Sequence, residues 1–322
     1  MLAAFVNSPS PDDPLSVLEI GDRPEPVVPD GWTVVRLRAA SLNHHDVFSL
    51  RGVGLPSERM PMILGCDGAG IDAEGNEVIL HAVISSPGFG GDETFDPKRT
   101  LLSELHQGTF TEQVAVPRRN VLPKPAGLSM AEGACLSTAW LTAYRMLFTK
   151  CGLKPGQTVL VQGASGGVAT ALIVLGRAAG YRVWVTGRSE AKRAQALELG
   201  ADQAFEPRAR LPERVDAVME TVGEATWGHS LKSLRPGGTL VVSGATSGPN
   251  PKADLARVFF LQLSVVGSTM GTRDELLGLL AFCETSGVRP VISRELPLAD
   301  AREGFAAMID GDTAGKIVFT MS

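Results

Sequence analysis

The stretch TVLVQGASGGVA, residues 158–169, decides the fold of this chain, because a buried apolar run stops there at glycines and then becomes helical. Residues 158–161 are rich in β-branched side chains, as is typical of a strand buried on both faces of a parallel sheet. Residues 171–179, ALIVLGRAA, have the apolar content of a helix that packs back on such a sheet. The pattern predicts a strand, a tight turn and a helix, which is how many proteins hold a dinucleotide.

A dinucleotide-binding turn needs small residues for the tight turn itself, for close approach of the pyrophosphate, and for helix packing. Here these places are Ala164, Gly166 and Ala169, so two of the three usual glycines are alanines. The N-terminus of the following helix would offer unpaired N–H groups to the pyrophosphate. A glycine-rich turn without a ligand is the alternative. We expect the cofactor contacts of this turn to be Gly163, Ala164, Ser165, Gly166, Gly167 and Val168.

Composition excludes several classes of protein. The chain has 322 residues, a formal net charge of −5 and no basic run, so we expect about two domains and no nucleic-acid partner. No charged start precedes an apolar segment, and no apolar run is long enough to span a membrane; we therefore expect a soluble, cytoplasmic protein without a membrane partner. Four cysteines lie far apart without CxxC spacing, which favours buried, reduced thiols.

The first 123 residues are rich in proline, glycine and short β-type runs and predict a compact all-β unit. The clearest strand-like runs are 32–37, 77–84 and 110–116. We place the least regular segment, 85–107, on the surface. Ser129 and Glu132 have the spacing of a capping box and introduce a helical stretch that leads to the glycine turn.

After the glycine turn, strands alternate with helices. Expected strands are 182–186, 217–221, 239–243 and 264–267, and expected helices are 189–199, 226–234 and 273–286. This alternation predicts a doubly wound parallel sheet with right-handed crossovers, and therefore an α/β protein.

The residues after the second strand of this sheet distinguish between nucleotides. NAD-binding units have an Asp or Glu there, roughly 20 residues past the glycines, that binds the ribose hydroxyls. This chain has no acid at that place, but has Gly187, Arg188, Ser189 and Lys192. These offer room, a guanidinium, a hydroxyl and an ammonium group to a 2′-phosphate. We therefore predict NADPH as the cofactor; a solvated helix start is the alternative explanation for the charges.

Eight motifs in order along the chain resemble the zinc-independent medium-chain dehydrogenase/reductase superfamily of the quinone oxidoreductase and alkenal or enone reductase type. They are Ala40-Ser41-Leu42-Asn43 with Asp46, Gly65-Cys66-Asp67-Gly68-Ala69-Gly70, Gly108-Thr109-Phe110-Thr111-Glu112, Leu141-Thr142-Ala143-Tyr144, the glycine turn, Leu199-Gly200-Ala201-Asp202, Arg235-Pro236-Gly237-Gly238 and Gly315-Lys316-Ile317-Val318. The resemblance implies a GroES-like β domain from residues 1–123 and 288–322. It also implies a Rossmann domain with a doubly wound parallel sheet from residues 124–287.

Zinc-dependent members of the superfamily bind their catalytic metal through a Cys, a His and a second Cys. By motif alignment this chain has Asn43, Cys66 and Ala134 at those places, and residues 67–134 contain no cysteine for a structural zinc. We expect no metal. A different site, built from Cys66, Asp67 and His44 or His45, is left open.

Without a Lewis acid, hydride transfer to a conjugated acceptor is favoured over alcohol oxidation. The protein must then orient the acceptor and donate a hydrogen bond to the oxygen that gains negative charge. Asn43 is the first candidate for this contact, with Asp46 positioning its loop. His44 and His45 could supply a proton, although structural histidines are the alternative. The tyrosine that several relatives carry in this region is missing, so solvent is also left as the proton source.

By similarity, further cofactor contacts would be Thr142, Gly223, Gly244, Ala245, Ser268, Met270 and Lys316, although structural roles compete for all of them. The run at 264–267 would be the last strand of the sheet, and an exposed parallel edge invites pairing with a second copy. We therefore predict a homodimer.

Together these patterns predict an NADPH-dependent oxidoreductase that transfers a hydride to a small-molecule substrate, a quinone or an α,β-unsaturated carbonyl, without zinc. Reduction of enoyl thioesters is an alternative. A non-catalytic NADPH-binding redox sensor is another, which the alanines in the glycine motif and the missing tyrosine favour. The identity of the acceptor has no readable sequence pattern.

Overall fold

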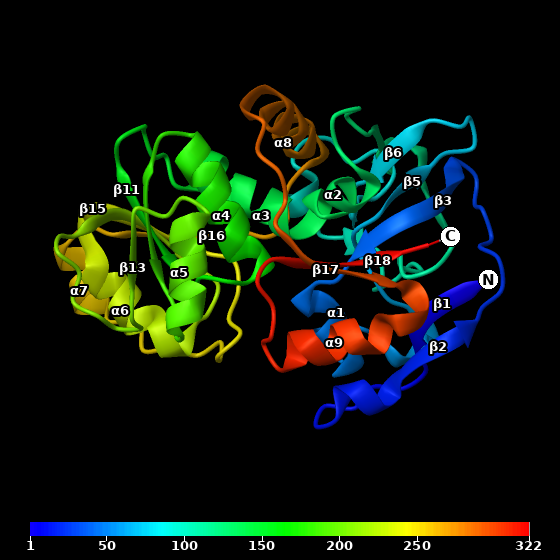
Figure 1. Cartoon of the computed structure of the whole chain (residues 1–322), viewed down its shortest axis with the longest axis horizontal. Helices are drawn as coiled ribbons and strands as arrows, with labels where there is room; N and C mark the ends of the chain where they lie inside the picture. Colours follow the sequence, from blue (N-terminus) through cyan, green and yellow to red (C-terminus); the bar gives the residue numbers. More distant parts are fainter. Residues whose placement is uncertain (322) are drawn as a thin grey trace. The chain divides into compact units, whose positions relative to one another are not determined.

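The computed structural model describes residues 1–321, which form two compact units. The first unit contains Met1–Leu141 together with the chain from Met270 onward, and the second contains Thr142–Thr269. Figure 1 draws most of the second unit in green and yellow, and it draws both the blue N-terminal and the red C-terminal segments in the first.

These units divide the chain at positions other than the predicted domain ranges, which were 1–123 with 288–322 and 124–287. Two helical segments account for the difference. α2 (Met130–Ala134) packs on strands β3, β5 and β6 of the first unit, and α8 (Arg273–Ser286) packs on the helical turn η5 (Leu136–Trp140) of the same unit. Both segments therefore belong to the first unit by their contacts.

The second unit is a six-stranded sheet in which all neighbouring strands are parallel. Its order is β13 (Gln203–Phe205), β12 (Arg182–Thr186), β11 (Thr158–Gln162), β14 (Val215–Glu220), β15 (Leu234–Val242) and β16 (Ser264–Gly267). The chain builds the sheet outward from β11 in one direction and then from β14 in the other. The predicted α/β class with a doubly wound parallel sheet is confirmed.

Local sequence explains these elements. All five residues of β11 are buried, as expected for a central strand covered on both faces. Four helices follow strands of the sheet: α4 (Gly167–Ala178), α5 (Glu190–Glu198), α6 (Glu224–Ser233) and α7 (Leu255–Phe260). The sequence did not predict β13 or α7, because three and six residues are too few to display a periodic pattern.

The first unit is mainly antiparallel β. Its largest sheet has the order β10 (Val121–Pro123), β6 (Glu77–Leu80), β5 (Ala69–Ile71), β3 (Trp32–Ser41), β18 (Lys316–Thr320) and β17 (Ile292–Pro297), and β9 (Gln113–Pro117) also pairs with β3. β1 (Leu2–Val6) lies between β2 (Leu18–Asp22) and β4 (Met62–Ile63), and β7 (Val83–Ile84) pairs with β8 (Thr100–Leu101). The first unit also contains α1 (His44–Leu50) and α9 (Ala301–Ile309), whereas α3 (Leu141–Tyr144) begins at its last residue before Thr142 and continues in the second unit.

The two ends of the chain meet in this sheet. β18 pairs antiparallel with β3, so that Val318 lies opposite Ser41, and Figure 1 draws the red strand beside the blue one. Below the sheet, Phe110 packs edge-to-face on Phe305 and Phe319, with ring centroids 6.0 and 5.0 Å apart. This core therefore fixes where Lys316, the first residue of β18, meets the end of β3.

The segment 85–107, which the sequence placed on the surface, is partly buried. Asp96, Leu102 and Ser103 are at most 1% exposed. The carboxylate of Asp96 accepts hydrogen bonds from the backbone N–H and the hydroxyl of Ser86, both at 2.7 Å. Because its polar groups are satisfied internally, an irregular segment can pack inside the unit.

Within residues 1–321, no helix has both the length and the apolar composition needed to cross a membrane. The predicted cytoplasmic location stays a prediction.

Candidate active site

A buried ammonium group joins the two ends of the first unit. Lys316 is 2% exposed, and its Nζ donates to the carbonyl of Leu42 at 2.8 Å and to Oδ1 of Asn43 at 2.6 Å. It also lies 3.5 Å from Oδ2 of Asp67, a carboxylate with no exposed surface. The hydroxyl of Ser41 donates to the same Oδ2 at 2.8 Å. We call Lys316, Asn43, Asp67 and Ser41 the lysine cluster.

The lysine cluster uses the whole amide of Asn43. An ammonium group can only donate, so the Asn43 oxygen faces Lys316 and its Nδ2 donates to Asp67 at 2.9 Å and to the Ser41 carbonyl at 3.2 Å. Asn43 is also 7% exposed. The predicted first contact to a substrate oxygen therefore has no spare donor in this arrangement, and Asn43 instead holds Lys316 and Asp67 in place.

Asp46 fixes the loop that carries these groups. Its Oδ2 accepts the backbone N–H of Asn43 at 2.9 Å, closing a capping box at the start of α1, and its Oδ1 accepts the N–H of Gly65 at 3.0 Å. Asp46 is fully buried. This geometry agrees with the loop-positioning role that the sequence suggested.

The adjacent histidines lie in different environments. The ring of His44 is exposed and makes no hydrogen bond with residues 1–321, although it lies 6.5 Å from the ring of Phe48. Desolvation and the positive charges of Lys316 and Arg51 lower the pKa of His44. A neutral imidazole with uncommitted ring nitrogens results, and it can donate or accept a hydrogen bond.

His45 is engaged on both ring nitrogens. Nδ1 lies 3.3 Å from Sγ of Cys66, and Nε2 lies 3.1 Å from Oε1 of Glu104. Burial lowers the pKa of His45, but the Cys66 sulfur and the carboxylates of Asp46 and Glu104 outweigh it and hold that pKa well above its usual value. Burial also raises the pKa of the Cys66 thiol, against the opposing effect of His45. His45 is therefore a structural link between α1 and the segment around Glu104.

In the second unit, the glycine turn leaves open space where a ligand would approach. Gly163 has a φ of +102°, which favours glycine, and a Cβ placed on Gly163 or Gly166 would meet no atom within 4 Å. Gly166 precedes α4, whose first residue is Gly167. Ala164 is 4% exposed and packs inward. The open face and the helix N-terminus suit a pyrophosphate.

The residues after β12 carry the groups that the sequence pattern assigns to a 2′-phosphate. Arg188 is exposed and forms no hydrogen bond or ion pair with residues 1–321, and Ser189 caps α5 by accepting the N–H of Lys192 at 3.3 Å. Gly187 is buried, and a Cβ there would lie 2.9 Å from the side chain of Arg193. Arg193 itself donates to the Gly187 carbonyl at 2.8 Å.

The other predicted cofactor contacts of the second unit follow the ends of three strands at the same edge of the sheet. Gly223 follows β14, Gly244 and Ala245 follow β15, and Ser268 follows β16. Close packing also requires glycine at two of these positions. A Cβ on Gly223 would lie 2.5 Å from the Gly248 carbonyl, and one on Gly244 would lie 2.9 Å from the Thr221 carbonyl.

Ser268 is partly buried, and its Oγ atom is buried without a hydrogen-bond partner among residues 1–321. The last two predicted contacts fall at the boundary between the units, with Thr142 in the second unit and Met270 in the first.

The structure therefore brings the predicted residues together in two groups. Asn43, His44, His45, Asp46 and Lys316 gather in the first unit, and the glycine turn with Gly187 to Lys192 gathers in the second. Sequence reasoning missed Glu104, which has no local signal. It also missed the buried polar residues that end β11, β12 and β14, although a polar residue closing an apolar strand was a usable sign.

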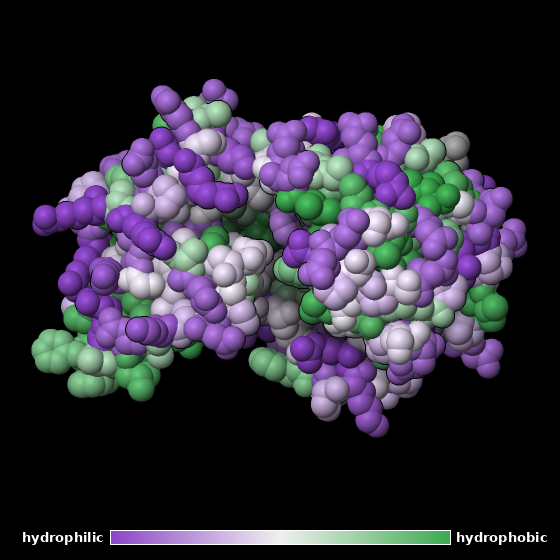
Figure 2. All heavy atoms as spheres, turned by 90° about the horizontal axis from the view of Figure 1, so that it is seen from below, coloured by the Kyte–Doolittle hydropathy of each residue, from purple (hydrophilic) through white to green (hydrophobic). Residues whose placement is uncertain are grey.

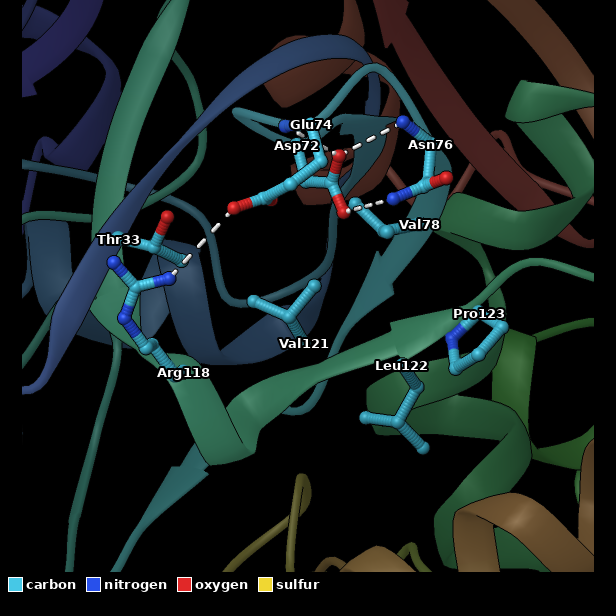
Figure 3. A pocket seen from close by; sticks show the side chains of 9 residues that line it. All are labelled: Thr33, Asp72, Glu74, Asn76, Val78, Arg118, Val121, Leu122 and Pro123. Carbon is cyan, nitrogen blue, oxygen red and sulfur yellow. Dashed lines mark hydrogen bonds and ion pairs between the residues drawn. The ribbon is translucent and has the colours of Figure 1, made fainter.

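A groove elsewhere on the first unit is a poorer candidate. It has a volume of about 370 Å³ and is drawn in Figure 3. Its polar groups bind one another: Asp72 accepts from Asn76 at 2.8 and 3.0 Å, and Glu74 pairs with Arg118 at 3.9 Å. The charged groups of this groove are therefore already paired with neighbours inside it.

Two known protein families match successive parts of the chain. Residues 29–126 match the family described as alcohol dehydrogenase GroES-like domain, and residues 167–285 match the family described as zinc-binding dehydrogenase. The predicted GroES-like domain is thereby confirmed.

Three curated relatives span most of the chain. A zinc-type alcohol dehydrogenase-like protein, YogA, of Leptosphaeria maculans is 31% identical, over 88% of this chain and 89% of its own length. An acryloyl-coenzyme A reductase of Metallosphaera sedula is 27% identical over 94% and 96%, and a quinone oxidoreductase of Mus musculus is 28% identical over 92% and 91%. A solved structure described as an NAD-dependent alcohol dehydrogenase covers 100% of both chains with 32% identity and a TM-score of 0.92.

The lysine cluster predicts an unequal effect of removing two buried lysines. Lys316→Met should destabilise the protein by about 3–5 kcal/mol, because it leaves the Asp67 carboxylate buried without its cation. Lys124→Met should cost less than about 2 kcal/mol, because Lys124 pairs at 2.9 Å with Glu77, whose carboxylate is 54% exposed and can be hydrated instead. Urea unfolding of the full chain measures both. Adding Asp67→Asn to Lys316→Met should recover part of the loss, and equal costs for the two lysines would contradict this account.

Proposed function

Because the chain belongs to the medium-chain dehydrogenase/reductase superfamily of oxidoreductases, we propose that it is an NADPH-dependent reductase of conjugated acceptors that works without zinc. The acceptor is a quinone or an α,β-unsaturated aldehyde or ketone. The observation that carries the proposal is the lysine cluster. In it, the ammonium group of Lys316 supplies the buried positive charge of the candidate site.

The residues present do not fit the catalytic zinc that the superfamily's zinc-dependent members use. Of the three aligned positions, Asn43 binds the Lys316 ammonium, Ala134 has no ligand atom, and only Cys66 offers a sulfur. Oδ2 of Asp67, beside Cys66 in the sequence, already accepts from Ser41 and Asn43, and its Oδ1 has no hydrogen-bond partner among residues 1–321. One carboxylate oxygen and one sulfur are too few protein ligands for a catalytic zinc. A divalent cation there would also be repelled by Lys316.

The nearest alternative metal cluster fits poorly. Ligand atoms of His45, Asp46 and Cys66 all lie within 4.8 Å of one another. However, each oxygen of Asp46 already accepts a backbone N–H, and burial raises the pKa of the Cys66 thiol that a metal would have to deprotonate. The proposed reaction therefore uses no metal.

The chemistry needs few groups from the protein. NADPH, when bound, supplies the hydride, and the residues then have to orient the acceptor and stabilise the oxygen that gains charge. We assign the hydrogen bond to this oxygen to His44, because its ring nitrogens are uncommitted. Both amide hydrogens of Asn43 are already used. A neutral imidazole can donate a hydrogen bond from its ring N–H to the developing enolate or phenolate oxygen, which then takes its proton from solvent. Asp46 holds the loop that carries His44.

The nucleotide preference rests on the charges after β12. The uncommitted guanidinium of Arg188 and the hydroxyl of Ser189 suit a 2′-phosphate. Glu206, a nearby acid, lies 3.6 Å from Arg193, which offsets its charge. The solved relative described as NAD-dependent makes NADH the necessary comparison.

The experiment that tests the proposal follows oxidation of NADPH and of NADH by protein treated with a chelator. The acceptors are a short quinone, an alkenal, an enoyl thioester and a simple aldehyde. NADPH oxidation with the quinone or the alkenal that survives the chelator is expected. Turnover of the thioester alone would instead favour the activity named for the acryloyl-coenzyme A reductase relative. NADPH binding with no turnover of any acceptor would favour a redox sensor, and activity on the aldehyde that the chelator abolishes would refute zinc independence.

The same assay tests His44. His44→Asn should lower kcat by roughly 100-fold or more with the preferred acceptor, which is the usual cost of removing one hydrogen-bond donor to a developing oxyanion. His106→Asn is the matched control, because His106 packs against Trp32 with ring centroids 4.9 Å apart. Equal kcat values for the two variants would remove His44 from the mechanism.

Two arginines at opposite ends of β12, Arg182 within it and Arg188 just after it, test the nucleotide preference. Arg188 follows the end of β12, whereas Arg182 begins it, at the opposite edge of the sheet, and pairs with Glu213 at 2.9 Å. Arg188→Ala should raise the KM for NADPH about tenfold or more and leave the KM for NADH unchanged, because a charge-assisted contact to phosphate is lost. Arg182→Ala should change neither value. A KM for NADPH that Arg188→Ala does not change would contradict the predicted phosphate site.

A homodimer is part of the proposal. Among residues 1–321, β16 pairs only with β15, and Val265 on it is 45% exposed. α7, shortly before it in sequence, exposes Leu255, Phe259 and Phe260 by 71%, 72% and 79%. Apolar atoms project at the left of Figure 2, the side on which Figure 1 labels α7. Such an apolar surface beside an open strand edge favours association.

Sedimentation equilibrium should therefore give about twice the chain mass of 33.9 kDa. Val265→Lys, which places a charge on the strand edge, should yield monomers. A monomeric mass for the unaltered protein would refute the dimer.

A further inference from the structure

Three adjacent parallel strands of the second unit end in buried polar residues. Gln162 ends β11, Thr186 ends β12 and Glu220 ends β14, and they are 1%, 3% and 0% exposed. β11 lies between the other two strands. The three side chains therefore lie at the edge of the sheet from which the candidate nucleotide-binding turns emerge, and below the surface of that edge.

Hydrogen bonds join these side chains in a single direction. The N–H of Gly163 donates to Oγ1 of Thr186 at 3.4 Å, and that hydroxyl donates to Oε1 of Gln162 at 2.7 Å. Nε2 of Gln162 donates to the hydroxyl of Ser230 at 3.0 Å, which donates to Oε2 of Glu220 at 2.6 Å. Each hydroxyl accepts once and donates once, so successive bonds polarise one another toward the carboxylate. We call this the strand-end chain.

Glu220 is the fixed end of the strand-end chain. Its Oε1 accepts the backbone N–H groups of Val222 and Gly223 at 2.8 and 3.1 Å, and the hydroxyl of Thr226 lies 2.9 Å from both carboxylate oxygens. A buried carboxylate is stable only when donors surround it in this way. Glu220 therefore orders the turn after β14 directly.

The contacts of the second amide hydrogen of Gln162 decide which end of the amide is nitrogen and which is oxygen. It faces Nδ1 of His229 at 2.9 Å, while Nε2 of His229 lies 2.9 Å from the carbonyl of Ala209. A carbonyl only accepts, so His229 carries its hydrogen on Nε2 and its Nδ1 accepts from Gln162. Both amide hydrogens of Gln162 are then used, and its oxygen is left to face Thr186.

We propose that Thr186 and Gln162, anchored on Glu220, are positioning residues that hold the glycine turn and the turn after β14 in the arrangement that binds the dinucleotide. The inference rests on the proposed binding of NADPH by the second unit. It has a specific consequence for recognition. The N–H of Gly163 points inward to Thr186, so the pyrophosphate is bound by N–H groups later in the turn, from Ala164 to Val168.

Three variants of buried threonines test the inference in the full chain, with NADPH titrated by fluorescence. Thr186→Val keeps the shape but removes the hydroxyl, which leaves Gln162 Oε1 and the Gly163 N–H without partners; the Kd for NADPH should rise about tenfold. Thr186→Ser restores the hydroxyl and should bind within about twofold of the unaltered protein. The kcat of Thr186→Val at saturating NADPH should change less than about twofold, because the hydroxyl touches no reacting atom.

Thr158→Val is the matched control. Thr158 begins β11, at the opposite edge of the sheet from Gln162; it is fully buried, and its Oγ1 has no hydrogen-bond partner among residues 1–321. Its removal should leave NADPH binding unchanged, and thermal unfolding should show that all three variants fold.

Each other outcome overturns the inference. If Thr186→Val binds NADPH as tightly as the unaltered protein, or if Thr186→Ser binds as weakly as Thr186→Val, the hydroxyl does not position the turn. If Thr158→Val weakens NADPH binding as much as Thr186→Val does, the loss of binding comes from altering any buried threonine of the sheet and not from the hydroxyl of Thr186. If the unaltered protein does not bind NADPH, the proposed function itself fails, and the inference fails with it.

Discussion

The first unit depends on how one buried ammonium group is satisfied. Lys316 lies at the start of the last strand, and its three partners come from the residues just after β3 and just before β5. A buried charge is tolerated only when donors and acceptors surround it, so these segments have to meet in one register. The pairing of β18 with β3 and the ring contacts of Phe319 bring Lys316 to that place.

This constraint also decides what the neighbouring residues can do. The amide of Asn43 binds the Lys316 ammonium and Asp67, and the carboxylate of Asp46 accepts two backbone N–H groups. In this arrangement both side chains therefore hold the structure in place and have no group free for the reaction. The same positive charge helps to lower the pKa of His44, whereas the sulfur and the carboxylates around His45 raise its pKa. Two adjacent residues of one type thus acquire different chemistry from their surroundings.

The second unit follows another constraint. Parallel strands send all their carboxyl ends to one edge, so turns distant in sequence become neighbours there. The exposed residues of these turns offer N–H groups and a guanidinium to a ligand, while Gln162, Thr186 and Glu220 form a connected polar layer beneath them. The exposed turn residues can contact a ligand, and we propose that the buried polar layer beneath them holds the turns in position.

The sequence by itself determined the parts that local physics decides. β12, β16 and α8 have the predicted bounds, and the capping box of Ser129 and Glu132 is formed, because hydrophobic periodicity and caps act within a few residues. The grouping of Asn43 to Asp46 and of the glycine turn followed from motif spacing. Only the tertiary structure decided which side chains are already committed. Lys316 and Asp67 are 249 residues apart in sequence and His45 and Glu104 are 59 apart, and burial, not spacing, determines that such groups must pair.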